Sequence, residues 1–96
     1  MPKNWRENLK FKIKKLEKGD TFYDFDNYKN HIVDFAQDGD NKIVIYKCWI
    51  RHKGYWKYYC DRMEILLYRI TLIYEDTIPK KDRAKFFEMN GVEYGY

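Results

Sequence analysis

The stretch KCWIRHKGYWKYYC, from Lys47 to Cys60, decides the fold of this 96-residue chain. It interleaves Trp and Tyr with Lys and Arg around a single glycine, Gly54, and contains no acidic residue. β-Branched and aromatic residues favour strands, and a glycine between two such runs favours the turn of a hairpin. The sequence therefore predicts an antiparallel hairpin from Lys42 to Asp61.

The register of this hairpin can be argued from its side chains, because a slip of one residue exchanges the two faces of a strand. A two-residue loop would set Ile50 against Lys57 and mix apolar with charged positions. A three-residue loop Lys53-Gly54-Tyr55 instead keeps the apolar positions together, with the pairs His52–Trp56, Ile50–Tyr58 and Cys48–Cys60. This register predicts that one face is buried and consists of Val44, Tyr46, Cys48, Ile50, Trp56, Tyr58 and Cys60.

The alternate residues of the same hairpin would form an outward face of cations and aromatic rings. An exposed Trp or Tyr among Lys and Arg suits base stacking and phosphate contact, or the centre of a protein interface. The alternative is that the N-terminal segment or a C-terminal helix covers Trp49. The candidate binding residues are Lys47, Trp49, Arg51, Lys57 and Tyr59, with Lys53 and Tyr55 at the rim.

The rest of the chain predicts a mainly β domain. Apolar and lysine residues alternate over 9–16, and short strand-like runs follow at 21–25 and 31–36. Over 63–74 the pattern is ambiguous, and we expect a short helical turn that leads into a final strand. Residues 80–89 predict a short C-terminal helix, capped by Asn90-Gly91. Five to six short strands indicate a small antiparallel barrel or rolled sheet, and 1–96 is expected to be a single domain.

A family resemblance rests on residues spread over 16–70, namely Gly19, Tyr23, Tyr28, Ile32, Val44, Tyr46, Lys47, Gly54, Trp56 and Met63. In their order and spacing, this part of the chain resembles a small, functionally uncharacterised bacterial and phage domain family. The Trp-x-Arg-Pro ending of that family is absent here. The resemblance implies an SH3-like β-barrel and no particular activity.

Charge is unevenly distributed along the chain, although the formal net charge is only +4 and the pI is about 9.0. Residues 1–19 carry seven Lys or Arg and two acids, and residues 42–62 carry six Lys or Arg and one acid. Between them, residues 20–41 carry six Asp and one Lys. The two basic blocks make a basic face if they lie together in the fold, with Lys10, Lys12 and Lys14 extending it. If the acidic block lies against them, they simply neutralise it.

Several classes of protein are not expected. The apolar runs are too short to cross a bilayer, and the charged N-terminal residues do not resemble a signal peptide, so we expect a cytoplasmic protein. The two cysteines, twelve residues apart, are expected to be buried, reduced thiols rather than metal ligands. The Asp residues of 20–41 could hold Mg²⁺, but solvated turns are the expected role. No catalytic motif is recognisable, so we expect neither an enzyme nor a cofactor.

Two functions remain. The first is a stand-alone interaction protein of a phage or mobile element that binds, and inhibits, a host nucleoprotein machine such as an RNA-guided defence effector, as anti-CRISPR proteins do. The second is a small nucleic-acid-binding β-barrel that contacts RNA or single-stranded DNA through the basic aromatic hairpin. Both predict a macromolecular partner, and neither involves a membrane.

Overall fold

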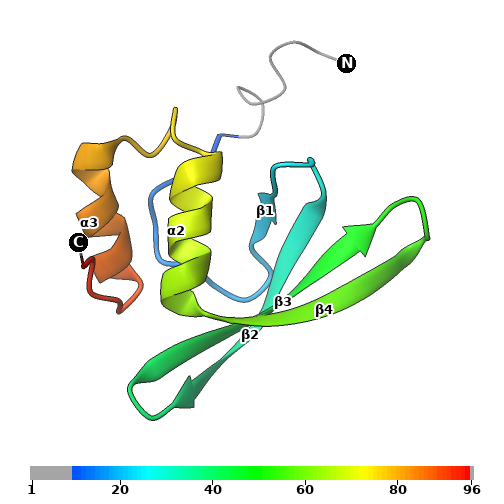
Figure 1. Ribbon diagram of the computed structural model, residues 1–96, viewed down its shortest axis with the longest axis horizontal. Coiled ribbons are helices and arrows are strands. Elements are labelled where there is room, and N and C mark those ends of the chain that lie inside the picture. The colour runs from blue at the N-terminus through cyan, green and yellow to red at the C-terminus, as the bar shows by residue number, and fades with distance from the viewer. Residues whose placement is uncertain (1–9, 96) are drawn as a thin grey trace.

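The computed structural model describes residues 10–95, which form one antiparallel sheet and two helices. The strands are β1 (Thr21–Tyr23), β2 (Lys29–Asp38), β3 (Asn41–Ile50) and β4 (Tyr55–Arg62), and the helices are α2 (Met63–Ile73) and α3 (Lys80–Met89). The strands lie in the order β1-β2-β3-β4, each paired with its neighbours in sequence. Figure 1 shows α2 and α3 side by side, and the β3–β4 turn projecting away from them. No described helix is long and apolar enough to cross a membrane.

The mainly β character and the helix over residues 80–89 are confirmed, but the number of strands is smaller than expected. The four strands form one open sheet, so the expectation of five to six strands is wrong for the described residues. Residues 10–16, which belong to the run predicted as the first strand, pair with no other strand, while Leu9 lies outside the described residues.

Residues 63–73 form a continuous helix, so the strand predicted at the end of this segment is wrong. The buried residues of α2 are Met63, Leu66, Leu67, Ile70, Thr71 and Ile73. Their spacing of three and four residues is the period of a helix that covers a core with one face. The alternating Tyr68, Ile70, Leu72 and Tyr74 suggested a strand, but Leu72 is exposed.

The core lies between the sheet and the two helices. Its sheet side consists of Phe22, Ile32, Val44 and Tyr46, and its helical side includes Met63, Leu66, Leu67, Ile70, Phe86 and Phe87. Segment 10–20 contributes buried Leu16 and the half-buried Phe11 and Ile13. The expected burial of Val44 and Tyr46 is therefore confirmed.

Helix α3 ends as the sequence predicted. The backbone N–H of Val92 donates to the carbonyl of Phe87, the N–H of Gly91 donates to that of Glu88, and Gly91 has a φ of +72°. This is a Schellman motif, in which glycine takes the left-handed position at no steric cost. The side chain of Asn90 is buried just before it and accepts a hydrogen bond from the N–H of Leu16 at 2.7 Å. Asn90 also donates to the carbonyls of Lys14 and Phe86, so it joins the N-terminal segment to α3.

The β3–β4 register differs from the predicted one. The turn comprises four residues, Arg51–Gly54, and the pairs that follow include Trp49–Trp56, Lys47–Tyr58 and Ile45–Cys60. The carbonyl of Ile50 accepts hydrogen bonds from the N–H groups of Lys53 and Gly54, and Gly54 has a φ of +70°. Closing the strands on this turn shifts the pairing by an odd number of residues, and so exchanges the two faces of β4.

Three predicted core positions are therefore misplaced. They are Trp56, which is half-buried, Tyr58, which is 61% exposed, and Cys60, all on the side of the sheet away from the helices. Ile50 remains on the core side of β3 and is half-buried. The cysteines are free and not cross-strand neighbours, because Cys48 pairs with Lys57 and Cys60 pairs with Ile45. Cys48 is buried as expected, whereas Cys60 is exposed.

Tyr46 connects the sheet to α2. Its hydroxyl donates to Oδ2 of Asp61 at 2.5 Å and accepts from Arg69 at 3.0 Å, and Arg69 lies 3.6 Å from the same carboxylate oxygen. Burial, followed by the hydrogen bond to Asp61, raises the pKa of Tyr46 to about 12. The three side chains bond the buried face of β3 to the end of β4 and the middle of α2.

The cysteines offer a test of the register. We expect a thiol reagent to modify Cys60 promptly in the native protein, and Cys48 only slowly. Cys48 is buried, and this burial raises the pKa of its thiol, so little reactive thiolate forms. Mass spectrometry of the labelled protein, with Cys60→Ser as the control, gives the result. Equal labelling of both cysteines would contradict the register.

The bonds of Tyr46 offer a test of stability. The Tyr46→Phe variant keeps the ring but loses hydrogen bonds to charged groups, so its free energy of unfolding at neutral pH should be lower by about 1.5–3 kcal/mol. The folded state holds the phenolic proton more tightly than the unfolded chain, whose tyrosine has its ordinary pKa of 10.0. The stabilisation that comes from the protonated Tyr46 hydroxyl is therefore fully present below pH 10. It is lost as the pH rises towards 12 and the hydroxyl ionises in the folded state.

Denaturant unfolding of both proteins from neutral to alkaline pH measures this difference. The gap between wild type and Tyr46→Phe should narrow above pH 10. A gap that is independent of pH would show that the hydroxyl is not held in its protonated form by the fold.

Candidate contact surface on the open face of the sheet

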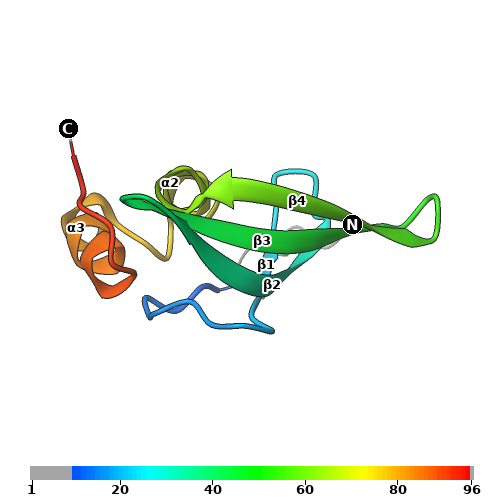
Figure 2. The ribbon, with the colours of Figure 1, turned by 90° about the horizontal axis from the view of Figure 1, so that it is seen from below.

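Helix α2 packs on one side of the sheet, with α3 beside it, and neither helix packs on the other side. Along β3, the buried residues Val44, Tyr46 and Cys48 face the core, and the half-buried residues between them face the opposite way. Figure 2 looks onto β2, β3 and β4, and neither helix crosses in front of β3. We call this side the open face, formed by Ile43, Ile45, Lys47 and Trp49 of β3, Trp56, Tyr58, Cys60 and Arg62 of β4, and His31 and Asp34 of β2.

An aromatic cluster lies on the open face. The rings of Trp49 and Trp56, which are directly opposite one another, pack edge to face with centroids 5.3 Å apart. The ring of His31 lies 5.2 Å from that of Trp56, and Nζ of Lys47 lies 4.5 Å from the centre of the Trp56 ring. Strands β2, β3 and β4 thus bring together residues that are far apart in the sequence. The ammonium group of Lys47 lies within this aromatic cluster.

His31 contributes to this cluster as a neutral ring. Burial, together with the charges of Lys29 and Lys47, lowers the pKa of His31 below its ordinary 6.5. Its Nδ1 lies 2.7 Å from the hydroxyl of Thr21, which is its cross-strand partner in β1. At neutral pH the histidine thus adds aromatic surface rather than positive charge.

Tyr58 provides the most accessible ring on the open face. It is 61% exposed and directly opposite Lys47, which is itself directly opposite His31. A large aromatic side chain with this exposure gains little from burial within its own chain. An uncovered ring beside a lysine is the combination that a nucleobase and its phosphate would require.

The acidic block lies mostly away from the open face. Asp24 and Asp26 belong to the loop between β1 and β2, where Asp24 accepts hydrogen bonds from two backbone N–H groups. Asp38 and Asp40 flank Gly39 at the β2–β3 turn, and Asp20 pairs with Lys14 at 2.7 Å. Asp34 does lie on the open face, where Lys18 pairs with its carboxylate at 3.1 Å. The block therefore does not neutralise the lysines of the open face.

The predicted binding residues do not form one surface. Lys47 and Trp49 lie on the open face, but Lys57 and Tyr59 pair with Cys48 and Tyr46 and thus point to the other side of β4. The Tyr59 ring stacks on the Tyr46 ring, with centroids 5.6 Å apart. The turn length explains the error, because the odd shift in register exchanges Lys57 and Tyr59 with Trp56 and Tyr58.

The other three predicted residues are near the turn. Lys53 is exposed within it, and Tyr55 is 46% exposed at the start of β4. The guanidinium of Arg51 lies 4.3 Å from the centre of the Tyr28 ring and donates to the carbonyls of Asn27 and Asp26. Arg51 thus ties the β3–β4 turn to the β1–β2 loop.

The N-terminal lysines do not extend the open face. Lys10, Lys12 and Lys14 line a separate hollow of about 220 Å³ together with Phe11, Leu16, Asp20 and Thr21. The segment that carries them packs its apolar residues into the core on the helix side of the sheet. The predicted single basic field is therefore divided between two surfaces.

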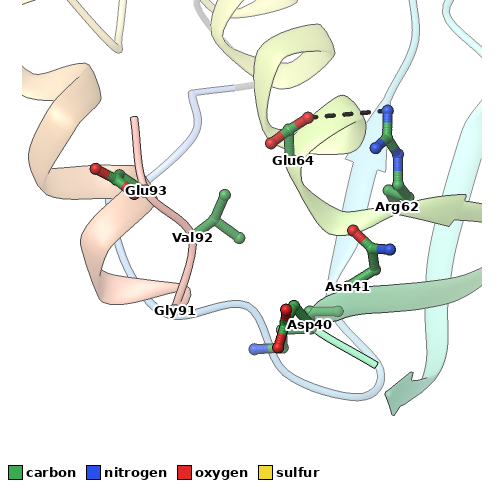
Figure 3. Close-up of a pocket in the computed structure, with 8 residues that line it drawn as sticks. Asp40, Asn41, Arg62, Glu64, Gly91, Val92 and Glu93 are labelled. Atoms are coloured by element: carbon green, nitrogen blue, oxygen red, sulfur yellow. Dashed lines mark ion pairs between the residues drawn. The ribbon is translucent and has the colours of Figure 1, made fainter. Parts of the chain in front are cut away.

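A second hollow, of about 210 Å³, lies between the β2–β3 turn, the start of α2 and the residues after α3 (Figure 3). Its described lining is mixed in charge: Asp40, Asn41, Lys42, Arg62, Glu64, Gly91, Val92 and Glu93. Nζ of Lys42 donates to the carbonyl of Asn90 at 3.1 Å, and Arg62 approaches Glu64 at 3.9 Å. These contacts join the hairpin to α2 and to the end of α3, which is a structural role.

Within residues 10–95, no group of three or more His, Cys, Asp or Glu side chains is arranged to hold a metal ion. No known protein family, curated protein or solved structure matches the chain. The resemblance to a small SH3-like domain family stays a prediction.

Proposed function

We propose that this chain is a non-enzymatic binding protein whose open face contacts single-stranded nucleic acid. The observation that carries the proposal is the Trp49–Trp56–His31 cluster, with Lys47 above Trp56 and exposed Tyr58 beside it. Proteins that bind single strands combine aromatic platforms for the bases with cations along the backbone.

The chemistry favours an unpaired strand over a duplex. A base must leave its stack before it can lie on Tyr58 or on the edge of the Trp49–Trp56 pair, and unpaired bases are free to do so. Lys47 lies between Tyr58 and His31 across the strands, so its ammonium group can reach a phosphate that joins two stacked bases. Lys29 is exposed and lies on the same side of β2 as His31, and Arg62 ends β4, so the two extend this charge along the outer strands.

A second candidate is a protein that binds and inhibits a host nucleoprotein machine, in the manner of phage-encoded anti-CRISPR proteins. The observation that favours it is the position of the acidic residues in turns at opposite ends of β2, where Asp26, Asp38 and Asp40 are exposed. Acidic turns around a basic open face would suit a partner that offers both a basic channel and a bound nucleic acid.

Adjacent tyrosines on β4 supply a matched test of the nucleic-acid proposal. Tyr58 lies on the open face and Tyr59 on the other, so Tyr58→Ala should lose a stacking partner and Tyr59→Ala should not. The lost stacking is worth about 1–3 kcal/mol, or about 5- to 150-fold in Kd. Lys47→Ala and Lys57→Ala form an equivalent pair for the charge.

The measurement is fluorescence anisotropy with a labelled oligonucleotide of about six nucleotides, short enough to occupy one open face. Lys47→Ala should lower the slope of log K against log salt by about 0.7, the contribution of one phosphate contact, and Lys57→Ala should leave the slope unchanged. Melting temperatures would verify that all four variants are folded. Salt-independent binding, or equal losses in Tyr58→Ala and Tyr59→Ala, would reject the open face as a nucleic-acid site.

A further inference from the structure

Strand β4 forms a free edge of the sheet. It pairs with β3 on one side and, among the described residues, with no strand on the other. Six of its eight residues are exposed, and only Trp56 and Asp61 are half-buried. In an antiparallel pair every second residue directs its N–H and C=O away from the partner strand, so β4 presents a row of unpaired groups along this edge.

The other outer strands are short or irregular, whereas β4 is long and regular. Strand β1 is only three residues long, and the outer part of β2 has a bulge between Ile32 and Asp34 followed by acidic residues. By contrast, β4 pairs with β3 without any shift in register and contains neither proline nor glycine. Three exposed tyrosines, Tyr55, Tyr58 and Tyr59, stand along it. A long, regular and aromatic edge of this kind favours strand association.

We propose that this edge binds the β4 edge of a second copy of the chain, antiparallel, around a two-fold axis at Tyr59. When two copies keep their helices on the same side of the joined sheet, each residue opposes one that points to the same face. One residue of β4 must then lie directly opposite its own copy, and the axis passes midway between these two residues. Tyr58 and Tyr59 are the two central choices.

Charge complementarity selects Tyr59. An axis there places Lys57 opposite Asp61 of the second copy, and Trp56 opposite its Arg62. Because the dimer is symmetric, each pair forms twice. This gives two ion pairs on the helix side of the sheet and two cation–aromatic contacts on the open face. An axis at Tyr58 would instead oppose Lys57 to Tyr59 and leave Asp61 opposite Tyr55, with no ion pair.

The dimer would join the two sheets into one and set both open faces on the same side. This assembly can be tested without nucleic acid, although Trp56 and Arg62 belong both to the proposed dimer contact and to the open face. If both proposals hold, a long strand could cross from one copy to the other, and linked sites bind more tightly than separate ones.

Sedimentation equilibrium of the purified full chain, without nucleic acid, tests the association. We expect a concentration-dependent species with twice the 12.0 kDa mass of the chain. Lys57→Glu places like charges opposite one another twice and should weaken the association by about tenfold or more. Lys53→Glu, the same charge change in the turn, should leave it unchanged. A wild-type protein that stays monomeric at millimolar concentration, or equal effects of the two variants, would overturn the proposal.

Disulfide trapping in a Cys60→Ser background tests the axis itself. Tyr59→Cys should give a disulfide-linked dimer under mild oxidation, because residue 59 meets its own copy at the axis. Tyr55→Cys is the matched control, an exposed tyrosine on the same face whose two copies would lie about 26 Å apart. Equal linking of the two variants would indicate random collision and exclude the axis at Tyr59.

Discussion

The four-residue turn at Arg51–Gly54 sets the pairing of Trp49 with Trp56, and the surfaces of the molecule depend on that pairing. Gly54 takes a left-handed conformation that most side chains avoid, and the turn closes two bonds onto the carbonyl of Ile50. With this register, Tyr59 stacks on Tyr46 on the helix side, while Trp56 stands on the open face. A change of one residue in the turn would exchange these roles along the whole of β4.

Helix α2 packs on the apolar face that this register creates. Because β4 continues directly into α2, the helix folds back over the side of the sheet that carries Val44 and Tyr46. The Tyr46, Asp61 and Arg69 contacts then fix the helix against the strands. Helix α2 lies over one face with α3 packed beside it, and the aromatic residues on the other face pack against each other and against Lys47.

Much of the secondary structure could be predicted from the sequence, because it depends on local patterns. The strands around Gly54 and the Schellman end of α3 are examples, and Lys47 and Trp49 are correctly assigned to an outward surface. The faces of β4 could not be predicted, since Trp, Tyr and Cys alternate with further Tyr and satisfy either register. Only a short helical turn was expected at the start of α2, because alternation at Tyr68–Tyr74 competed with the helical spacing of Met63, Leu66, Leu67 and Ile70. Only packing against the sheet distinguishes the two.

The contact made by the buried side chain of Asn90 can form only late in the synthesis of the chain. This side chain bonds to the backbone at Leu16, a residue 74 positions earlier in the chain. At about 5–20 residues per second, a ribosome adds Asn90 about 4–15 s after Leu16. During that interval the N–H of Leu16 lacks Asn90 as its acceptor, and Phe11 lacks Phe86, on which its ring later packs edge to face. The newly made chain therefore remains for seconds without the contacts that join its N-terminal segment to α3, and it completes the fold only once α3 has been made.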